Sequence, residues 1–249
     1  MAGHSKWANI KHRKGRQDAI RGKIFTRLAK EITVSAREGG GDISANPRLR
    51  LAVQNAKAVN MPNDNITRAI KKGTGEIEGV QYEEITYEGY APNGVAIILE
   101  TVTDKKVRTV AEIRALFGKL GGNMGETNSV AWNFERKGVV NINTNGKSED
   151  ELMEHVLESG AEDMEWDDES TRIVCQMADF GTVMKYFEEN NFEIGESKLE
   201  YIPKDYINIS NADDARKILK FIDAFEDHDD VQNLYHNFEI DDSIAESLD

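Results

Sequence analysis

The sequence contains a single cysteine, Cys175, among its 249 residues. One cysteine can form no intrachain disulfide and cannot build a cysteine zinc cluster, so we expect Cys175 to be a small buried apolar residue. The five histidines are scattered and show no His-x-x-x-His spacing. We therefore expect no metal ion and no cofactor.

Long apolar runs are also absent from the sequence. No run reaches the ~18 apolar residues of a membrane-spanning helix, and residues 1–23 lack the apolar stretch of a signal peptide. Residues 1–37 are basic and poor in acids, as transit peptides are, but they run directly into a patterned helix. We expect a cytoplasmic protein with no membrane partner.

Charge is distributed very unevenly along the chain. Residues 1–75 carry 16 Lys and Arg against 5 Asp and Glu, whereas the remainder carries 15 against 40 and the whole chain has a net charge of −14. At physiological salt the Debye length is ~8 Å, so a distant acidic body does not cancel the field of a basic end. The segregation indicates a polyanionic partner for the N-terminal end, with nucleic acid as the leading candidate.

Three amphipathic helices are predicted in this basic region. Apolar residues recur at helical spacing from Gln17 to Glu38. A second helix is predicted after Asn46 as N-cap, with Pro47 at its first position, and a third helix opens at Pro62 and stops at Lys72-Gly73. Residues 1–75 are therefore interpreted as a basic three-helix domain, followed by a glycine-rich linker at 74–81.

Beyond the linker, strands rich in Val, Ile and Tyr alternate with helices. Two βαβ units are predicted: Val95–Thr101, Val107–Leu120 and Ser129–Phe134, and then Lys204–Ile209, Ala212–Phe225 and Val231–Ile240. Between them the order is βαββαβ, which is the ferredoxin-like order: Val139–Asn143, Ser148–Ser159, a strand near Met164, Ile173–Met177, Phe180–Asn190 and Lys198–Ile202.

The predicted fold class is therefore α+β and multidomain, with an N-terminal three-helix domain followed by two α+β lobes. A ferredoxin-like domain at 137–203 would be inserted into a split α+β domain made of 82–136 and 204–249. This arrangement is favoured because each βαβ half alone would leave a sheet edge and one face uncovered. The alternative is one larger mixed sheet across residues 83–249.

The first candidate site is a basic run near the N-terminus that contains one aromatic residue. Lys and Arg neutralise phosphates and release counterions, and a Trp offers a flat face on which an unpaired base stacks. The alternative is a solvated arm whose Trp packs on the helices. The candidate nucleic-acid contacts are Lys6, Trp7, Lys11, His12, Arg13, Lys14 and Arg16.

A second group of cations would continue this surface along the first helix. Arg21, Lys23, Arg27 and Lys30 belong to it, with Arg48, Arg50, Lys71 and Lys72 as possible extensions. A charged, solvated helix face is the alternative interpretation. Gln54 and Asn55 are the only amide pair in this region of the kind that reads base edges in a groove.

No group of residues indicates catalysis. Ser5 beside His4 is treated as a coincidence of the sequence, and acidic residues are too numerous to single out a pair. The glycines at 39–41 follow a helix and lack the Gly-Lys-Ser/Thr ending of a nucleotide loop, and those at 121–125 are typical of a turn. We expect a protein that is not an enzyme.

Several ordered motifs resemble those of the YebC/PmpR family over essentially the whole chain. They are the segment Met1 to Trp7, Arg21-Gly22-Lys23-Ile24-Phe25, Gly39-Gly40-Gly41-Asp42, Asn46-Pro47-Arg48-Leu49-Arg50, Tyr87-Glu88-Gly89-Tyr90-Ala91-Pro92, Arg108-Thr109-Val110-Ala111-Glu112 and Gly121-Gly122-Asn123. Two segments depart from the family pattern. Asp104 to Thr109 reads Asp-Lys-Lys-Val-Arg-Thr where many members have Asp-Asn-Arg-Asn-Arg-Thr, and Gly125 to Val130 differs from Gly-Thr/Ala-x-Gly-Ser-Val.

The resemblance implies a helical N-terminal domain, two α+β domains and a cytoplasmic role in regulating gene expression. Family members are described as DNA-binding transcriptional regulators, so the first hypothesis is a regulator that binds promoter DNA. Relatives that activate mitochondrial translation of cytochrome oxidase subunit I imply the alternative, a ribosome-binding translation factor that recognises ribosomal RNA and relieves stalling at proline-rich stretches. A third hypothesis treats the basic domain as a docking surface for the acidic lobes of another copy; the sequence does not specify an oligomeric state.

Overall fold

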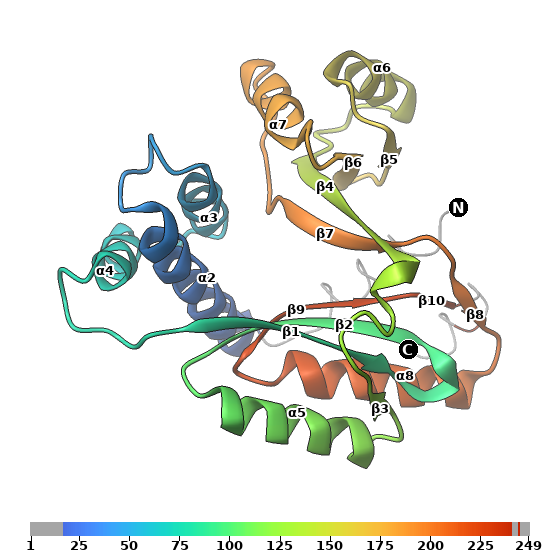
Figure 1. The fold of residues 1–249 in the computed structure, drawn as a ribbon. Coiled ribbons are helices and arrows are strands. Elements are labelled where there is room, and N and C mark those ends of the chain that lie inside the picture. The colour runs from blue at the N-terminus through green and yellow to red at the C-terminus, as the bar shows by residue number, and fades with distance from the viewer. Residues whose placement is uncertain (1–16, 241–243, 245–249) are drawn as a thin grey trace. The chain divides into compact units, whose positions relative to one another are not determined.

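The structure is a computed structural model that describes residues 17–240 and residue 244 (Figure 1). Contacts within the chain divide it into two compact units. The helix–insert unit comprises residues 17–79 and 136–200, and the split unit comprises residues 80–135 and the chain from residue 201 onward. Both units contain helices and strands, which confirms the α+β class. Within the described residues, no helix combines the length and apolar character of a membrane-spanning segment.

Three helices form the N-terminal part of the helix–insert unit: α2 (Gln17–Gly39), α3 (Pro47–Ala58) and α4 (Asn63–Thr74). Helix α3 begins as predicted, with Pro47 in its first turn and the Leu49 N–H donating to the Asn46 side chain at 3.0 Å. The facing sides of the helices form one apolar core: Ile32, Ala36, Leu49, Ala52, Val53, Ala56, Met61, Ile66 and Ala69.

The predicted stop of the third helix at Gly73 is wrong by one residue. Gly73 lies inside α4, and the residue with the left-handed conformation is Gly75, at φ 79°. A Cβ on Gly73 would lie 2.4 Å from the Thr33 carbonyl oxygen and 2.7 Å from the Ala36 Cβ. Glycine is therefore needed here for the close approach of α4 to α2, and not for a helix cap.

The inserted segment forms a four-stranded sheet with two helices. Its elements are β4 (Phe134–Asn143), α6 (Glu149–Ser159), β5 (Asp163–Glu165), β6 (Ser170–Gln176), α7 (Phe180–Glu189) and β7 (Lys198–Pro203). The strand order β5-β6-β4-β7 is that of a ferredoxin-like fold, as predicted. Alternate residues of β4 and β6 point to the helices, where Val140, Ile142 and Ile173 pack against Val183 and Phe187.

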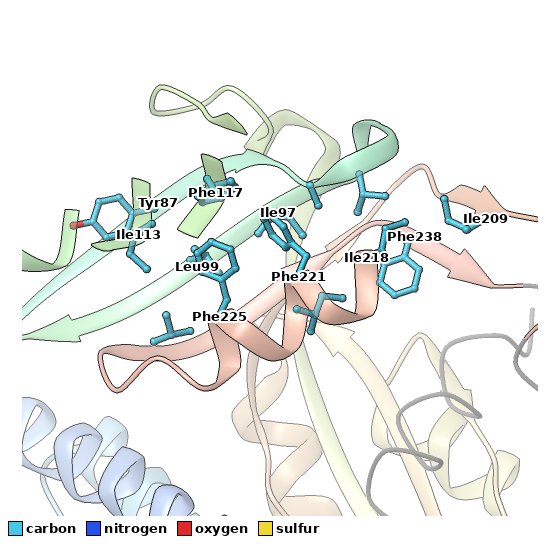
Figure 2. Close-up of a cluster of buried hydrophobic side chains, with 14 of the residues drawn as sticks. Tyr87, Ile97, Leu99, Ile113, Phe117, Ile209, Ile218, Phe221, Phe225 and Phe238 are labelled. Carbon is cyan, nitrogen blue, oxygen red and sulfur yellow. The ribbon is translucent and has the colours of Figure 1, made fainter. Parts of the chain in front are cut away.

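The split unit contains a second four-stranded sheet, in the order β3-β1-β2-β9, covered on one face by two helices (Figure 1). Its elements are β1 (Glu83–Tyr90), β2 (Ala96–Thr103), α5 (Lys106–Lys119), β3 (Asn123–Met124), β8 (Ile207–Ile209), α8 (Ala212–Glu226), β9 (Val231–His236) and β10 (Phe238–Ile240). Figure 2 shows Phe117 of α5 and Phe221 and Phe225 of α8 packed over Ile97 and Leu99 of β2. The Phe117 ring centroid lies 5.3 Å from that of Phe221 and 4.8 Å from that of Phe225.

Two predictions for this unit are wrong, and one strand was missed. Residues 129–133 do not form a strand but a loop that contains a 3-10 turn, η2 (Ala131–Asn133), and the strand after α5 is the two-residue β3. Strand β1 was not predicted. The predicted strand over 231–240 is broken at Asn237, whose side chain accepts from the Ala96 N–H and whose carbonyl accepts from the Ile207 N–H. As a result β9 pairs with β2, whereas β10 pairs in parallel with β8.

The alternative of one mixed sheet is excluded, because the two four-stranded sheets are separate and a third, two-stranded sheet joins β8 and β10. The parallel pair β8 and β10 flanks α8, so the second predicted βαβ unit exists in a shortened form. The fold therefore has a ferredoxin-like lobe inserted into the chain of another α+β lobe.

Candidate nucleic-acid interface

Most of the predicted contact residues lie outside the described residues: Lys6, Trp7, Lys11, His12, Arg13, Lys14 and Arg16. Arg21 belongs to α2, but its side chain is also outside the described part. Lys23 and Arg27 are the two predicted contacts whose side chains the structure describes. They remain predictions, and their position on α2 can be examined directly.

Lys23, Arg27 and Lys30 form a basic stripe along the first half of α2. At 100° per residue their side chains fall within about 60° of one another, and Leu28 and Ile32 lie on the opposite side. Leu28 and Ile32 belong to the core of the three helices. The core therefore fixes which side of α2 faces inward and turns the cationic side away from it.

This stripe is confined to the N-terminal half of the helix. From Ile32 to Ala36 every residue of α2 is buried, including the polar Thr33 and Ser35. The Thr33 hydroxyl donates to the Ala69 carbonyl of α4 at 3.2 Å, so this half of the helix is enclosed by its neighbours. The basic stripe on α2 consequently extends from Lys23 to Lys30.

A second basic group lies at the end of α4. Arg68, Lys71 and Lys72 are exposed, and the three have no ion-pair partner among the described residues. Lys71 and Lys72 occupy the last turn, where cations are also stabilised by the partial negative charge of the helix C-terminus. This group is a surface of uncompensated positive charge that can receive an anion.

Arg48 and Arg50, in contrast, are occupied within the protein. Arg48 pairs with Glu31 at 3.0 Å and with Glu38 at 2.6 Å. Arg50 donates to the carbonyl oxygens of Ile43 and Ser44, at 3.1 and 2.5 Å. The charge of Arg48 is therefore compensated by two carboxylates, and the guanidinium of Arg50 holds the turn between α2 and α3.

The same turn contains Asp42, whose carboxylate accepts two hydrogen bonds that favour its charged form. The Ser44 hydroxyl and the Ser44 N–H donate to Asp42 Oδ1 at 2.7 and 2.8 Å. Because both bonds favour the charged form, they lower the pKa of the Asp42 carboxyl from its ordinary value. This charge stabilises the turn and places a negative group beside Arg50.

The amide pair on α3 is also occupied. Gln54 Nε2 donates to Glu188 Oε1 at 2.8 Å, and Asn55 Nδ2 donates to the Ser197 carbonyl at 2.8 Å. The Ser197 N–H returns a bond to Asn55 Oδ1 at 3.0 Å. Leu51, one turn before, packs on the apolar core of the insert. Helix α3 therefore uses its amides to hold the inserted lobe, and they are not available to base edges.

The segment Asp104 to Thr109 leads into helix α5, and its exposed arginine is paired with acids of the same unit. Arg108 Nη2 lies 2.7 Å from the buried carboxylate of Asp230 and 3.0 Å from Asp104. The hydrogen bond to Asp230 and its charge raise the pKa of Arg108. The Thr109 hydroxyl donates to the same Asp230 oxygen at 2.8 Å. Arg108 serves the packing of the helix start and does not project as a phosphate ligand.

Sequence reasoning missed one exposed aromatic residue. Trp132 was assigned to a predicted strand, but it lies in the loop before β4 with 65% of its surface exposed. Its position after a glycine-rich turn could have indicated a loop. The alternation of Val130, Trp132 and Phe134 instead favoured a strand. Among residues 17–240 and residue 244, no cluster of His, Cys, Asp and Glu is arranged to hold a metal ion.

The fold and these charges define a class of protein: a basic helical segment joined to a ferredoxin-like lobe that is inserted into another α+β lobe. Family models identify the class further. The family described as "TACO1/YebC protein N-terminal domain" matches residues 5–76, and that described as "TACO1/YebC second and third domain" matches residues 82–238. The chain belongs to the TACO1/YebC family, which confirms the resemblance drawn from the motifs.

Curated relatives match over their whole length. A probable transcriptional regulatory protein of Halothermothrix orenii is 52% identical over 250 residues, covering 100% of this chain and 99% of the relative. A protein of the same description from Thermotoga maritima is 51% identical over 249 residues, covering 100% and 98%. The crystal structure of a conserved hypothetical protein from Aquifex aeolicus has a TM-score of 0.88 and 43% identity, covering 95% of this chain and 98% of that one.

Proposed function

We propose that the protein is a nucleic-acid-binding regulator of gene expression, and specifically a DNA-binding transcriptional regulatory protein that acts in the cytoplasm. The observation that carries this proposal is the segregation of charge, with 16 basic and 5 acidic residues in positions 1–75 of a chain whose net charge is −14. The relatives' description as probable transcriptional regulatory proteins supports it.

The mechanism is positioning without catalysis. Cations of the N-terminal arm and of the α2 stripe contact phosphates and release condensed counterions, which gives affinity without sequence information. The acidic lobes repel extensive wrapping by the same polymer, so most phosphate contacts fall on the basic end, while the lobes contribute shape, local or protein contacts. Sequence preference would arise from the shape and deformability of the nucleic acid.

A second candidate is a translation factor that binds folded ribosomal RNA. The observation that favours it is the occupation of Gln54 and Asn55 by the insert, because a helix that reads the major groove needs free polar side chains. Folded RNA is recognised through shape, phosphates and unpaired bases, which requires no such helix. The proposed basic surface would serve both partners.

The experiment is a binding titration with a charge-neutralised arm. Alanine at Lys11, Arg13, Lys14 and Arg16 together is expected to abolish binding to duplex DNA and to folded RNA. The matched control replaces four exposed cations on α7 and α8 instead, namely Lys185, Arg216, Lys217 and Lys220. This control removes the same charge and should bind as the unmodified protein does.

The salt dependence of the same titration tests the phosphate contacts. About five contacts would give a log–log slope near −4.5 for duplex DNA and near −3.5 for a single strand. The relative affinity for promoter duplexes and ribosomal RNA fragments separates the two candidates. Unchanged affinity of the arm variant, or a slope near zero, would contradict the proposal.

A further inference from the structure

The loop that carries Trp132 is fixed by a buried carboxylate. Glu88 of β1 is 6% exposed. Its Oε1 accepts a hydrogen bond from the Asn128 N–H at 2.7 Å, and its Oε2 accepts from the N–H groups of Val130 and Ala131, both at 2.8 Å. Three charge-assisted bonds to one side chain hold this backbone in a single conformation.

Further hydrogen bonds and apolar packing hold both ends of the loop. The Tyr90 hydroxyl donates to the Ser129 carbonyl at 3.1 Å, and Val130 is fully buried in the small core on this side of the sheet. At the other end, Asn133 Nδ2 donates to the Asp205 carbonyl at 3.1 Å, and the Lys204 N–H donates to the Asn133 carbonyl at 2.8 Å. The backbone is thus held by hydrogen bonds on both sides of the exposed Trp132.

Trp132 is presented to solvent with its polar atom already satisfied. Its indole Nε1–H donates to the Ser129 carbonyl at 3.0 Å, which orients the ring on the loop. The indole is left with its flat faces and no hydrogen bond to offer, although 65% of the residue is exposed. Such a ring can bind a ligand by stacking.

A cation is bound to the backbone of the residue that carries this ring. Lys204 Nζ donates to the Trp132 carbonyl at 3.2 Å, and Lys204 is exposed. An ammonium group has three donors, so two remain for a further acceptor. The other exposed neighbours along the loop are polar: Glu126, Thr127 and Asn128.

We propose that Trp132 and Lys204 form a binding site for an unpaired nucleotide, with the base stacked on the indole and its phosphate bound by Lys204. Proteins bind single-stranded nucleic acids by stacking bases on aromatic side chains and by placing cations near the phosphates. A protein partner is less well matched, because the core of a protein interface is a contiguous patch depleted of charge, and the surroundings of Trp132 are polar and charged. The inference rests on the proposed function, and adds a contact in the split unit to those of the basic segment.

The site is tested by fluorine NMR of the full chain labelled with 5-fluorotryptophan at Trp7, Trp132 and Trp166. The Trp132 resonance is assigned as the one missing from the Trp132→Phe variant. Adding a single-stranded oligonucleotide of mixed sequence should shift or broaden this resonance. The resonance of Trp166, whose indole N–H donates to the Lys147 carbonyl, should stay in place and serves as the control.

Affinities of three variants for the same oligonucleotide separate stacking from general apolar contact. Trp132→Ala and Trp132→Leu should each weaken binding by roughly tenfold, at the low end of what one stacked base contributes, whereas Trp132→Phe should stay within about threefold of the unmodified protein. Lys204→Ala should make the salt slope shallower by about 0.7. Circular dichroism of each variant checks that the fold is retained.

The outcomes distinguish this inference from the proposed function. If the oligonucleotide binds but the Trp132 resonance does not move and Trp132→Ala binds normally, the site is refuted and the proposed function stands. Full oligonucleotide affinity of Trp132→Leu together with loss in Trp132→Ala would refute stacking, because any apolar side chain at this position would then suffice. If neither DNA nor RNA binds the unmodified protein, both the proposed function and the site are refuted.

Discussion

Asn55 and Ser197 lie 142 positions apart in the sequence and exchange two hydrogen bonds, one through each polar end of the Asn55 amide. Both residues are buried, so each supplies a donor and an acceptor that water cannot reach. Without the pair, these polar groups would have no hydrogen-bond partner. The pair fixes α3 to the insert and explains why an amide in a basic helical segment is not available to a nucleic acid. It also means that the helices and the insert are coupled energetically.

Replacement of Asn55 by alanine should therefore destabilise the helix–insert unit. The variant leaves the Ser197 N–H and carbonyl buried without partners, and we expect a loss of about 2 kcal/mol in the free energy of unfolding. Urea-induced unfolding followed by circular dichroism measures this loss. The control is Gln54→Ala, whose bond to Glu188 is exposed, and which should change stability by less than about 0.5 kcal/mol. Equal effects of the two substitutions would contradict the role given to the Asn55 pair.

Gly73 should be intolerant of a methyl group although it lies in a helix. Alanine is the better helix former by about 1 kcal/mol, but a Cβ at Gly73 would lie 2.4 Å from the Thr33 carbonyl oxygen. We expect Gly73→Ala to destabilise the protein by roughly 1–3 kcal/mol, the range typical of overpacking.

The matched control for this substitution is Gly22→Ala in α2. A Cβ at Gly22 meets no described atom within 4 Å, so the same chemical change should stabilise the protein by about 0.5–1 kcal/mol. Thermal unfolding of both variants decides the question. The close approach of α4 to α2 is disproved if Gly73→Ala raises the melting temperature as Gly22→Ala does.

The carboxylate of Glu88 should be needed for the loop that presents Trp132. In Glu88→Gln one acceptor oxygen becomes an NH2 group, which cannot accept from the facing N–H groups. We expect a loss of about 2 kcal/mol in stability and faster amide hydrogen exchange at Asn128, Val130 and Ala131. Glu83→Gln, an exposed substitution on the same strand, should leave these exchange rates unchanged.

Cys175 should make stability depend on pH in the alkaline range. Burial raises the pKa of its thiol to about 11, and the charges of Asp179 and Glu162 add to the effect. The unfolded thiol has its ordinary pKa of about 8.5, so between roughly pH 9 and 11 the unfolded state loses this proton first and stability falls as the pH rises. Below that window both states keep the proton and Cys175 contributes no pH dependence.

The measurement is the free energy of unfolding against pH for the unmodified protein and for Cys175→Ala. Other groups titrate in the same range, but they are common to both proteins, so the difference between the curves reports Cys175 alone. The difference should change between pH 9 and 11 and be flat at lower pH. In the native protein the thiol should also resist alkylation at pH 8, and rapid alkylation there would contradict its burial.

Elements whose ends are set by local chemistry could be predicted from the sequence. Asn46 and Pro47 define the start of α3, and Ser148 with Glu151 forms a capping box at the start of α6, because each cap depends on residues within one helical turn. The strand order of the insert followed from its βαββαβ pattern, since the pattern of crossovers leaves few ways to pair the strands. These features are local or topologically constrained.

Elements that depend on distant partners could not be predicted. Val130, Trp132 and Phe134 alternate as a strand does, but the N–H groups of this segment bond to Glu88, some forty positions earlier in the chain. Strand β1 was hidden by its glutamates and by Gly89, where a Cβ would lie 2.5 Å from the Asn123 carbonyl oxygen. In both cases the deciding contact is formed by the tertiary fold.

The candidate interface shows the same division. The basic character of the N-terminal region is a property of composition and was evident from the sequence. The sequence did not show which cations are paired with carboxylates. Arg48 pairs with Glu31 across a turn, and Arg108 pairs with Asp230, which lies far away in the sequence. The exposed position of Trp132 likewise required the structure, since its loop had been interpreted as a strand.

The most direct test of the account is ultraviolet crosslinking of the intact protein in cells, followed by sequencing of the DNA and RNA that it retains. We predict retained nucleic acid enriched in promoter DNA, and loss of that signal when Lys11, Arg13, Lys14 and Arg16 are replaced by alanine. A sharp ribosomal RNA peak instead would assign the protein to translation. Retention of no nucleic acid would contradict the central claim and make the basic segment a protein-docking surface.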